Sequence, residues 1–266
     1  MTSFARFIGI DYSGAATPTT PLQGIRVFES EPGVDPIEIR ASSGASRHWS
    51  RRRLAEWIVR RILEGEPLLF GIDHGFSFPE SYFRKYRLNG DWGQFLDDFS
   101  MHWPSDGDHQ TVRALRPSNL RAGDSRDRRY VEILAKAKSV FHFDVPGSVA
   151  TSTHAGLPWL RFIRRNVGRK AHFWPYDGLR VPEGASVIAE VYPALWFREG
   201  APPKWTRDQW DAYLIAESLS LASASGVLDK WLEGPPKGLY PDQNSSEGWI
   251  LGFEKMPRSL LSKTTP

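Results

Sequence analysis

The stretch RFIGIDYSG, residues 6–14, decides the fold class of this 266-residue chain. Phe7, Ile8 and Ile10 form a short apolar run that predicts a buried strand rather than a helix. The run ends in Asp11, which a small-residue turn follows. Open α/β sheets bind ligands at the carboxyl ends of their strands, although aspartate is also an ordinary turn residue. The stretch therefore predicts a core strand that carries either a functional acid or a turn-capping one.

Two later segments repeat this design. PLLFGIDHG, residues 67–75, is again an apolar run that ends in Gly-Ile-Asp, which places Asp73 before a glycine turn. SVIAEVYP, residues 186–193, carries Glu190 near its end, where Pro193 ends the strand because it has no backbone N–H to donate. Three candidate core strands thus end in acids.

The segments between the first two acids predict the topology. Residues 24–29 and 36–40 alternate apolar and polar side chains, which is typical of half-exposed antiparallel strands. A helix with an apolar stripe at helical spacing is expected to begin after Ser50. In the resulting β-β-β-α-β order the fourth strand lies parallel to the first and beside it, about 4.8 Å away. Acids at the ends of these two strands are then close enough to share a cation.

Residues 78–170 lack a strand rhythm and predict an insertion or cap, mainly helical, within a single domain of residues 1–266. From residue 113 to 170 the segment holds thirteen Lys and Arg against four Asp and Glu, a net charge of nine. Such a segment attracts a polyanion if its charges share one face, or is simply a solvated surface. Three of its side chains, with one from the first turn, are candidate substrate-binding groups: Lys138, His154, Arg164 and Ser13.

A further helix is expected to begin at Thr206, because Thr206 and Gln209 fit a capping box. Asp208 and Asp211 follow three residues apart and so lie on neighbouring positions of its first turns. They are either functional acids or favourable partners of the helix dipole. The segment of residues 247–253 predicts a closing strand or a docked tail.

Composition excludes several classes of protein. The chain has no cysteine, so it has neither disulfides nor a thiolate zinc site, and any metal must be held by oxygen or imidazole. It has no run of eighteen apolar residues and no signal-peptide pattern at its start, which predicts a soluble cytoplasmic protein that is not in a membrane. A Gly-x-Ser-x-Gly elbow is also absent.

Four acids are the candidate catalytic and metal-binding residues: Asp11, Asp73, Glu190 and Asp211. Packed together they would repel one another unless a divalent cation compensated their charge, and all-oxygen ligands favour Mg²⁺ or Mn²⁺. Two such ions about 3.5–4 Å apart would support phosphodiester cleavage. In that scheme Asp11 bridges the ions, Asp73 and Glu190 each complete one shell, and Asp211 holds the second ion or orients the water.

The order of these motifs resembles the ribonuclease H-like superfamily, and more closely its predicted-nuclease branch, which is still described as a domain of unknown function. The similar features are the two Gly-Ile-Asp strands, Glu190-Val191-Tyr192-Pro193, Asp211-Ala212 and the closing Glu247-Gly248-Trp249-Ile250. The resemblance implies a mixed five-stranded sheet in the order 3-2-1-4-5, flanked by helices, with the insertion between strands 4 and 5. It also implies a two-metal nuclease centre that hydrolyses nucleic acid at the four acids.

Two other readings of the sequence remain open. In the first, the protein is a non-catalytic module that binds nucleic acid or a partner protein, and the acids only cap turns and a helix. In the second, the two Gly-Ile-Asp strands are the phosphate loops of an actin-like phosphotransferase. That fold needs a second strand meander after the second loop, whereas Pro79 and Trp-rich sequence follow Asp73.

Overall fold

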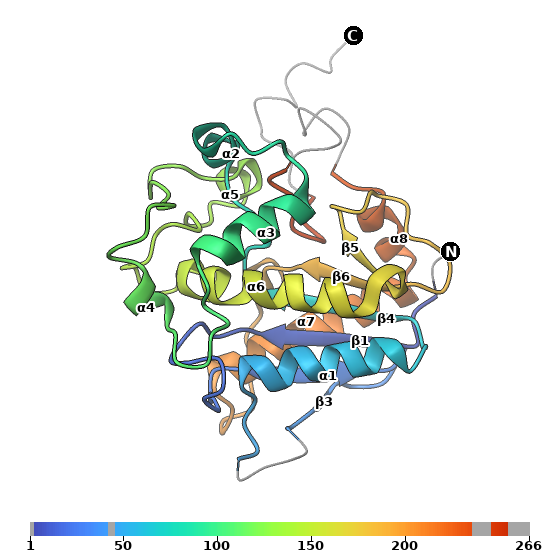
Figure 1. Ribbon diagram of the computed structural model, residues 1–266. Coiled ribbons are helices and arrows are strands. Elements are labelled where there is room, and N and C mark those ends of the chain that lie inside the picture. Colours follow the sequence, from blue (N-terminus) through green and yellow to red (C-terminus); the bar gives the residue numbers. More distant parts are fainter. Residues whose placement is uncertain (1–2, 42–45, 236–245, 255–266) are drawn as a thin grey trace.

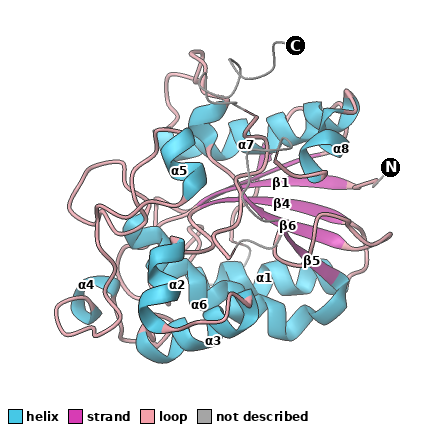
Figure 2. Cartoon of the chain, turned by 90° about the horizontal axis from the view of Figure 1, so that it is seen from above, coloured by secondary structure: helices cyan, strands magenta, loops and turns pink. Residues whose placement is uncertain are grey.

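The computed structural model describes residues 3–41, 46–235 and 246–254. In these residues a mixed sheet of six strands lies between two layers of helices (Figures 1 and 2). The strands are β1 (Arg6–Asp11), β2 (Arg26–Ser30), β3 (Ile37–Glu38), β4 (Leu68–Asp73), β5 (Ala171–Trp174) and β6 (Ser186–Glu190). The helices are α1 (Arg51–Leu63), α2 (Glu80–Tyr86), α3 (Trp92–His102), α4 (Val112–Leu115), α5 (Tyr130–Leu134), α6 (Ala150–Val167), α7 (Arg207–Ala224) and α8 (Val227–Leu232), with short 3-10 turns η1 (Gly168–Lys170) and η2 (Pro193–Leu195).

The predicted β-β-β-α-β start is confirmed. β1 pairs antiparallel with β2 and parallel with β4, so that Asp11 is the cross-strand neighbour of Asp73. Helix α1 begins where expected, because the Ser50 side chain accepts a hydrogen bond from the Arg53 N–H. Helix α7 has the predicted capping box between Thr206 and Gln209.

The expected five-stranded order is wrong, because the sheet has the order β3-β2-β1-β4-β6-β5. The Glu190 strand, β6, does lie beside β4 as expected. The additional strand is β5, a four-residue run that pairs parallel with the outer side of β6. Its sequence, Ala-His-Phe-Trp, follows a basic turn directly and is too short to show alternation, which explains why periodicity did not reveal it.

Residues 78–170 contain helices α2 to α6 and no strand among these described residues. Helix α6 packs beside α1 in the layer that covers one face of the sheet, as Figure 1 shows. The segment of residues 246–253 is a docked tail rather than a strand, and the Leu251 N–H donates to the Glu190 carbonyl at 2.9 Å. The Glu247 carboxylate accepts from the N–H groups of Glu80 and Tyr130, the first residues of α2 and α5.

Two glycines set the distance between α7 and the sheet. Gly9 of β1 and Gly71 of β4 are cross-strand neighbours, and α7 lies directly over both. A Cβ atom on Gly9 would lie 2.2 Å from the Ala212 carbonyl oxygen, and one on Gly71 would lie 2.8 Å from Ile215 Cγ2. The glycine in each Gly-Ile-Asp motif therefore lets the helix backbone approach the strands closely, as glycine does at such contacts.

We expect Gly9→Ala to lower the free energy of unfolding by about 1–3 kcal/mol, because α7 must move away from β1 to relieve the overlap. The control is Gly33→Asn, at an open position where φ is 74° and asparagine tolerates that conformation. Urea unfolding followed by tryptophan fluorescence measures both. Equal stability of Gly9→Ala and the wild-type protein would show that the close approach has no energetic role.

Candidate functional site

Asp11 and Asp73 project from the same face of the sheet, at the carboxyl ends of β1 and β4. Side chains alternate along a strand, so Asp11 lies on the same face as Gly9, the residue under α7. The same alternation places Asp73 on the face of Gly71. Both aspartates therefore extend toward the start of α7, and both are half-buried.

The first turns of α7 bring two more acids to this place. Asp208 and Asp211 line a cavity of about 500 Å³ together with Asp11 and Asp73. Gly24 forms part of the same wall, and a Cβ added to it would lie 3.5 Å from both Asp208 Oδ2 and Ser13 Oγ. Three of the four predicted acids thus meet in one cavity, and Asp208 joins them.

The pKa values of Asp11, Asp73 and Asp211 are raised in this cavity. The pKa of Asp11 is well above its usual range, first because burial disfavours the charged form and then because of the charges of Asp73, Asp208 and Asp211. Burial raises the pKa of Asp73 to about 8, with additional repulsion from Asp211 and Glu190. The pKa of Asp211 is also raised, chiefly by burial, although Arg207 opposes the shift.

Little in the described chain compensates this charge. The Arg207 Nε donates to Asp211 Oδ2 at 3.3 Å, and the Arg207 side chain is mostly exposed. Within the described residues, Asp11, Asp73 and Asp208 have no hydrogen bond or ion pair from a side chain. Also within those residues, no three His, Asp or Glu side chains are close enough to hold a metal ion as they stand. The donor chemistry suits Mg²⁺ or Mn²⁺, but the carboxylates would have to move together to bind either.

The lining of the cavity also carries hydroxyl groups. Ser13 follows β1, while Ser148 and Ser152 lie at the start of α6. The loop after β1 is held by Arg51, a fully buried residue whose guanidinium donates to the carbonyl groups of Ser13, Ala15 and Ala16. The cavity is therefore lined by both carboxylates and neutral hydroxyl groups.

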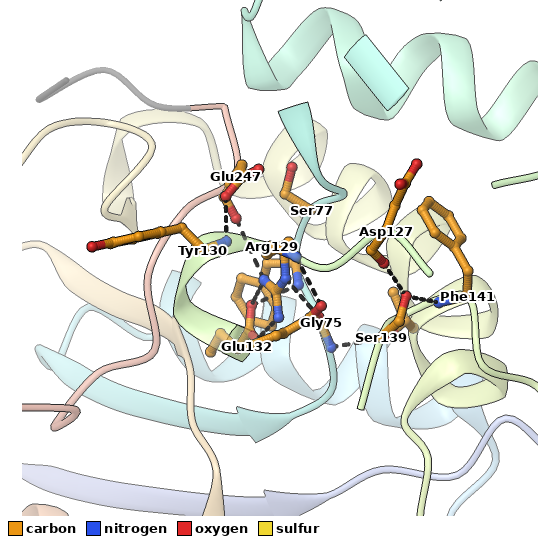
Figure 3. Close-up of polar contacts among 12 residues, drawn as sticks. Gly75, Ser77, Asp127, Arg129, Tyr130, Glu132, Ser139, Phe141 and Glu247 are labelled. Atoms are coloured by element: carbon orange, nitrogen blue, oxygen red, sulfur yellow. Dashed lines mark hydrogen bonds and ion pairs between the residues drawn. The ribbon is translucent and has the colours of Figure 1, made fainter. Parts of the chain in front are cut away.

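Glu190 does not line this cavity. Its neighbours Ala189 and Val191 pack in the core under α7, whereas its cross-strand partner Ile72 packs in the core under α1 and α6. Strand alternation thus directs Glu190 to the face opposite to that of Asp73. There its carboxylate pairs with the buried Arg129. Figure 3 shows Arg129 beside Glu132, Tyr130 and Glu247.

The predicted substrate-binding residues are dispersed. Ser13 lines the acid cavity. Lys138 lines a neighbouring cavity of about 30 Å³ between Asp73 and Glu190, where its ammonium donates to the Pro146 carbonyl. His154 is fully buried among aromatic rings, with its Nδ1 on the Ala150 carbonyl, and burial lowers its pKa to about 3. Arg164 pairs with Asp177 away from both cavities.

Tyr12 and His74, the residues that follow Asp11 and Asp73, are both buried. Tyr12 lines the acid cavity, but it is buried and contacts the ring of His74. His74 is buried as well, its Nδ1 lies 2.9 Å from the Gly75 carbonyl, and burial lowers its pKa to about 4. A histidine in this state is neutral at pH 7 and supports the turn after β4.

Sequence reasoning missed three parts of the site. Arg207 and Tyr192 line the cavity, and no role was predicted for either, although Tyr192 belongs to the Glu190-Val191-Tyr192-Pro193 motif. Asp208 had a signal, its position three residues before Asp211 on one helix, but helix-dipole stabilisation explained it equally well. The pairing of Arg129 with Glu190 joins residues 61 apart in sequence, so no local pattern could indicate it.

In comparisons with family models, curated proteins and solved structures, nothing matches this chain. Within the described residues, no helix has the length and apolar character needed to cross a membrane. The function must therefore be argued from the cavity itself.

The raised pKa of Asp73 predicts how stability depends on pH. Unfolded Asp73 releases its proton near pH 4, whereas the folded protein keeps it until about pH 8. The folded state binds more protons in this window, so the free energy of unfolding should fall as pH rises from 4 to 8 in metal-free buffer. Asp73→Asn should flatten this fall and raise the free energy of unfolding at pH 8 by at least about 1.4 kcal/mol, the equivalent of one pKa unit.

Thermal unfolding at several pH values, with a chelator present, measures this effect. The control is Asp35→Asn, which removes an exposed carboxylate and should leave the pH profile unchanged. A wild-type profile that rises from pH 4 to 8, or a steeper fall in Asp73→Asn, would contradict the prediction.

Proposed function

We propose that the chain is a divalent-metal-dependent nuclease, a phosphodiester hydrolase of ribonuclease H-like fold that acts on nucleic acid. The observation that carries the proposal is the cavity that Asp11, Asp73, Asp208 and Asp211 line together, where Arg207 pairs with Asp211 and only partly compensates their charge. The β-β-β-α-β order with an acid at each of two adjacent strand ends supports it as well. An uncompensated group of carboxylates costs stability, and binding a cation removes that cost.

In this proposal Mg²⁺ or Mn²⁺ is held by Asp11 and Asp73, with Asp208 and Asp211 beside them. A bound cation of this kind polarises a phosphodiester and lowers the pKa of a water molecule that attacks it. Carboxylates that are ionised repel a phosphate group, and a bound cation removes this repulsion by compensating their charge. The hydroxyl groups of Ser13, Ser148 and Ser152, which line the same cavity, offer hydrogen bonds to a bound phosphate.

The basic segment contributes less free charge than its composition indicates. Seven of its thirteen basic residues form ion pairs within the described chain: Arg116, Arg121, Arg126, Arg129, Arg161, Arg164 and Arg165. Arg116, for example, pairs with Asp144, and Arg164 pairs with Asp177. The segment is therefore largely tied into the protein, and a role in binding nucleic acid falls to its remaining lysines and arginines.

The second candidate function is a non-catalytic module that binds nucleic acid or a partner. It is favoured by one observation, that the described side chains do not already form a metal-holding group. The actin-like phosphotransferase is disfavoured, because only helices and loops occupy the described chain between β4 and β5, where that fold requires a second strand meander.

The test is binding and cleavage by the wild-type protein and Asp11→Asn. Calorimetric titration with Mn²⁺ is expected to show binding that weakens at least tenfold in the variant. Labelled single-stranded DNA, duplex DNA, RNA and RNA–DNA hybrid are expected to include a substrate that is cleaved only with the metal and only by the wild-type protein. Asp35→Asn is the control for a lost carboxylate.

Three outcomes separate the candidates. Metal binding with metal-dependent cleavage supports the nuclease. Metal binding without cleavage of any of the four substrates contradicts the nuclease and leaves a metal site of another function. Nucleic-acid binding that is indifferent to Mn²⁺ favours the non-catalytic module.

A further inference from the structure

Every oxygen of the Glu190 carboxylate is already engaged. The Arg129 guanidinium donates through Nη1 to Oε2 at 2.7 Å and through Nη2 to Oε1 at 2.5 Å. The Phe76 N–H donates to Oε2 at 2.8 Å. A bidentate arginine with a backbone donor is among the strongest arrangements that a carboxylate can have in a protein.

This pair lies deep in the protein. The side chains of Arg129 and Glu190 are 1% and 4% exposed. Releasing Glu190 to bind an ion would leave the guanidinium buried with one partner fewer, and breaking a buried pair in this way is strongly unfavourable. The pair is thus a fixed part of the fold rather than a surface contact that exchanges with solvent.

Arg129 has other partners that hold it in place. Its Nε donates to Glu132 Oε1 at 2.9 Å, and its backbone N–H donates to Glu132 Oε2 at 3.0 Å. The next residue, Tyr130, donates its N–H to Glu247 of the docked tail. Figure 3 shows how these contacts join the start of α5 to the tail. Arg129 therefore cannot leave Glu190 without disturbing three segments of the chain.

The positive charge of Arg129 also disfavours a second bound cation near Glu190. A cation held by Glu190 would lie beside the guanidinium, and two like charges at short distance in a poorly solvated interior repel strongly. Asp73 lines both the acid cavity and the small cavity that Glu190 and Arg129 border. A second ion held between Asp73 and Glu190 would lie in the small cavity that the Arg129 guanidinium borders, beside a charge of the same sign.

We infer that the acid cavity takes a single divalent cation at its aspartates, and that the Arg129 guanidinium occupies the carboxylate that a second cation would need. This inference rests on the proposed metal site and narrows it, because it replaces a two-cation centre with a one-cation centre. Glu190 is then a structural residue that joins the end of β6 to Arg129 and to the Phe76 N–H in the turn after β4.

The experiment compares two isosteric variants, Asp73→Asn and Glu190→Gln. Calorimetry with Mn²⁺ and electron paramagnetic resonance of free Mn²⁺ give the number of ions per chain and their affinity without any substrate. The wild-type protein is expected to bind one ion per chain. Asp73→Asn should weaken binding at least tenfold, whereas Glu190→Gln should change it less than threefold and yet lower the melting temperature.

A second variant covers the case in which Glu190→Gln does not fold. The triple variant Arg129→Gln, Glu132→Gln, Glu190→Gln removes the guanidinium together with both carboxylates that pair with it and keeps similar volumes, so none of these three residues leaves a buried charge without its partner. It too is expected to bind one ion with affinity close to that of the wild-type protein. Thermal unfolding and circular dichroism confirm that each variant tested is folded.

The outcomes distinguish this inference from the proposed function. Two ions per chain, one of them lost in either Glu190 variant, would overturn the one-cation inference and leave the nuclease proposal intact. One ion with no cleavage of nucleic acid would overturn the nuclease and support the inference. Absence of Mn²⁺ binding in the wild-type protein would overturn both.

Discussion

The close packing of α7 on β1 and β4 is the constraint on which the candidate site depends. Gly9 and Gly71 have no side chains, so the surface of the sheet is low at these two positions. The backbone of α7 at Ala212 packs directly against the sheet there. Asp211 immediately precedes this contact on the helix, and Asp11 and Asp73 lie two residues beyond the glycines on the strands. The packing contact and the acids are thus parts of one arrangement, and any change that lifts the helix also separates the carboxylates.

Strand alternation then decides which acids take part. Asp11 and Asp73 share the face of the sheet that α7 covers, whereas Glu190 lies on the other face and pairs with Arg129. The three strands end at the same edge, so their acids are near one another, and Glu190 still raises the pKa of Asp73. Acids at the same edge of a sheet form a common site only if their side chains also point to the same face of that sheet.

The sequence predicted the features that local patterns encode. Apolar runs and turns gave the first three strands, helix α1 and strand β4, and the capping box at Thr206 gave the start of α7. Strand β5 was not predicted, because four residues are too few to show an alternation of apolar and polar side chains. The buried ion pair of Arg129 and Glu190 was not predicted for another reason. The two residues are 61 positions apart in the sequence, and only the folded chain brings them together. The burial of His154 was hidden likewise, because its aromatic neighbours come from distant segments.

The docked tail has a consequence for how the chain is made. Glu247 accepts hydrogen bonds from the N–H groups of Glu80 and Tyr130, which precede it by 167 and 117 residues. During synthesis from the N-terminus, the N–H groups at the starts of α2 and α5 therefore lack this acceptor until Glu247 has left the ribosome. Contacts so distant in sequence form late and slow folding. A nascent chain that stalls before Glu247 would present these two helix starts without the carboxylate, as a substrate for chaperones and proteases rather than a folded protein.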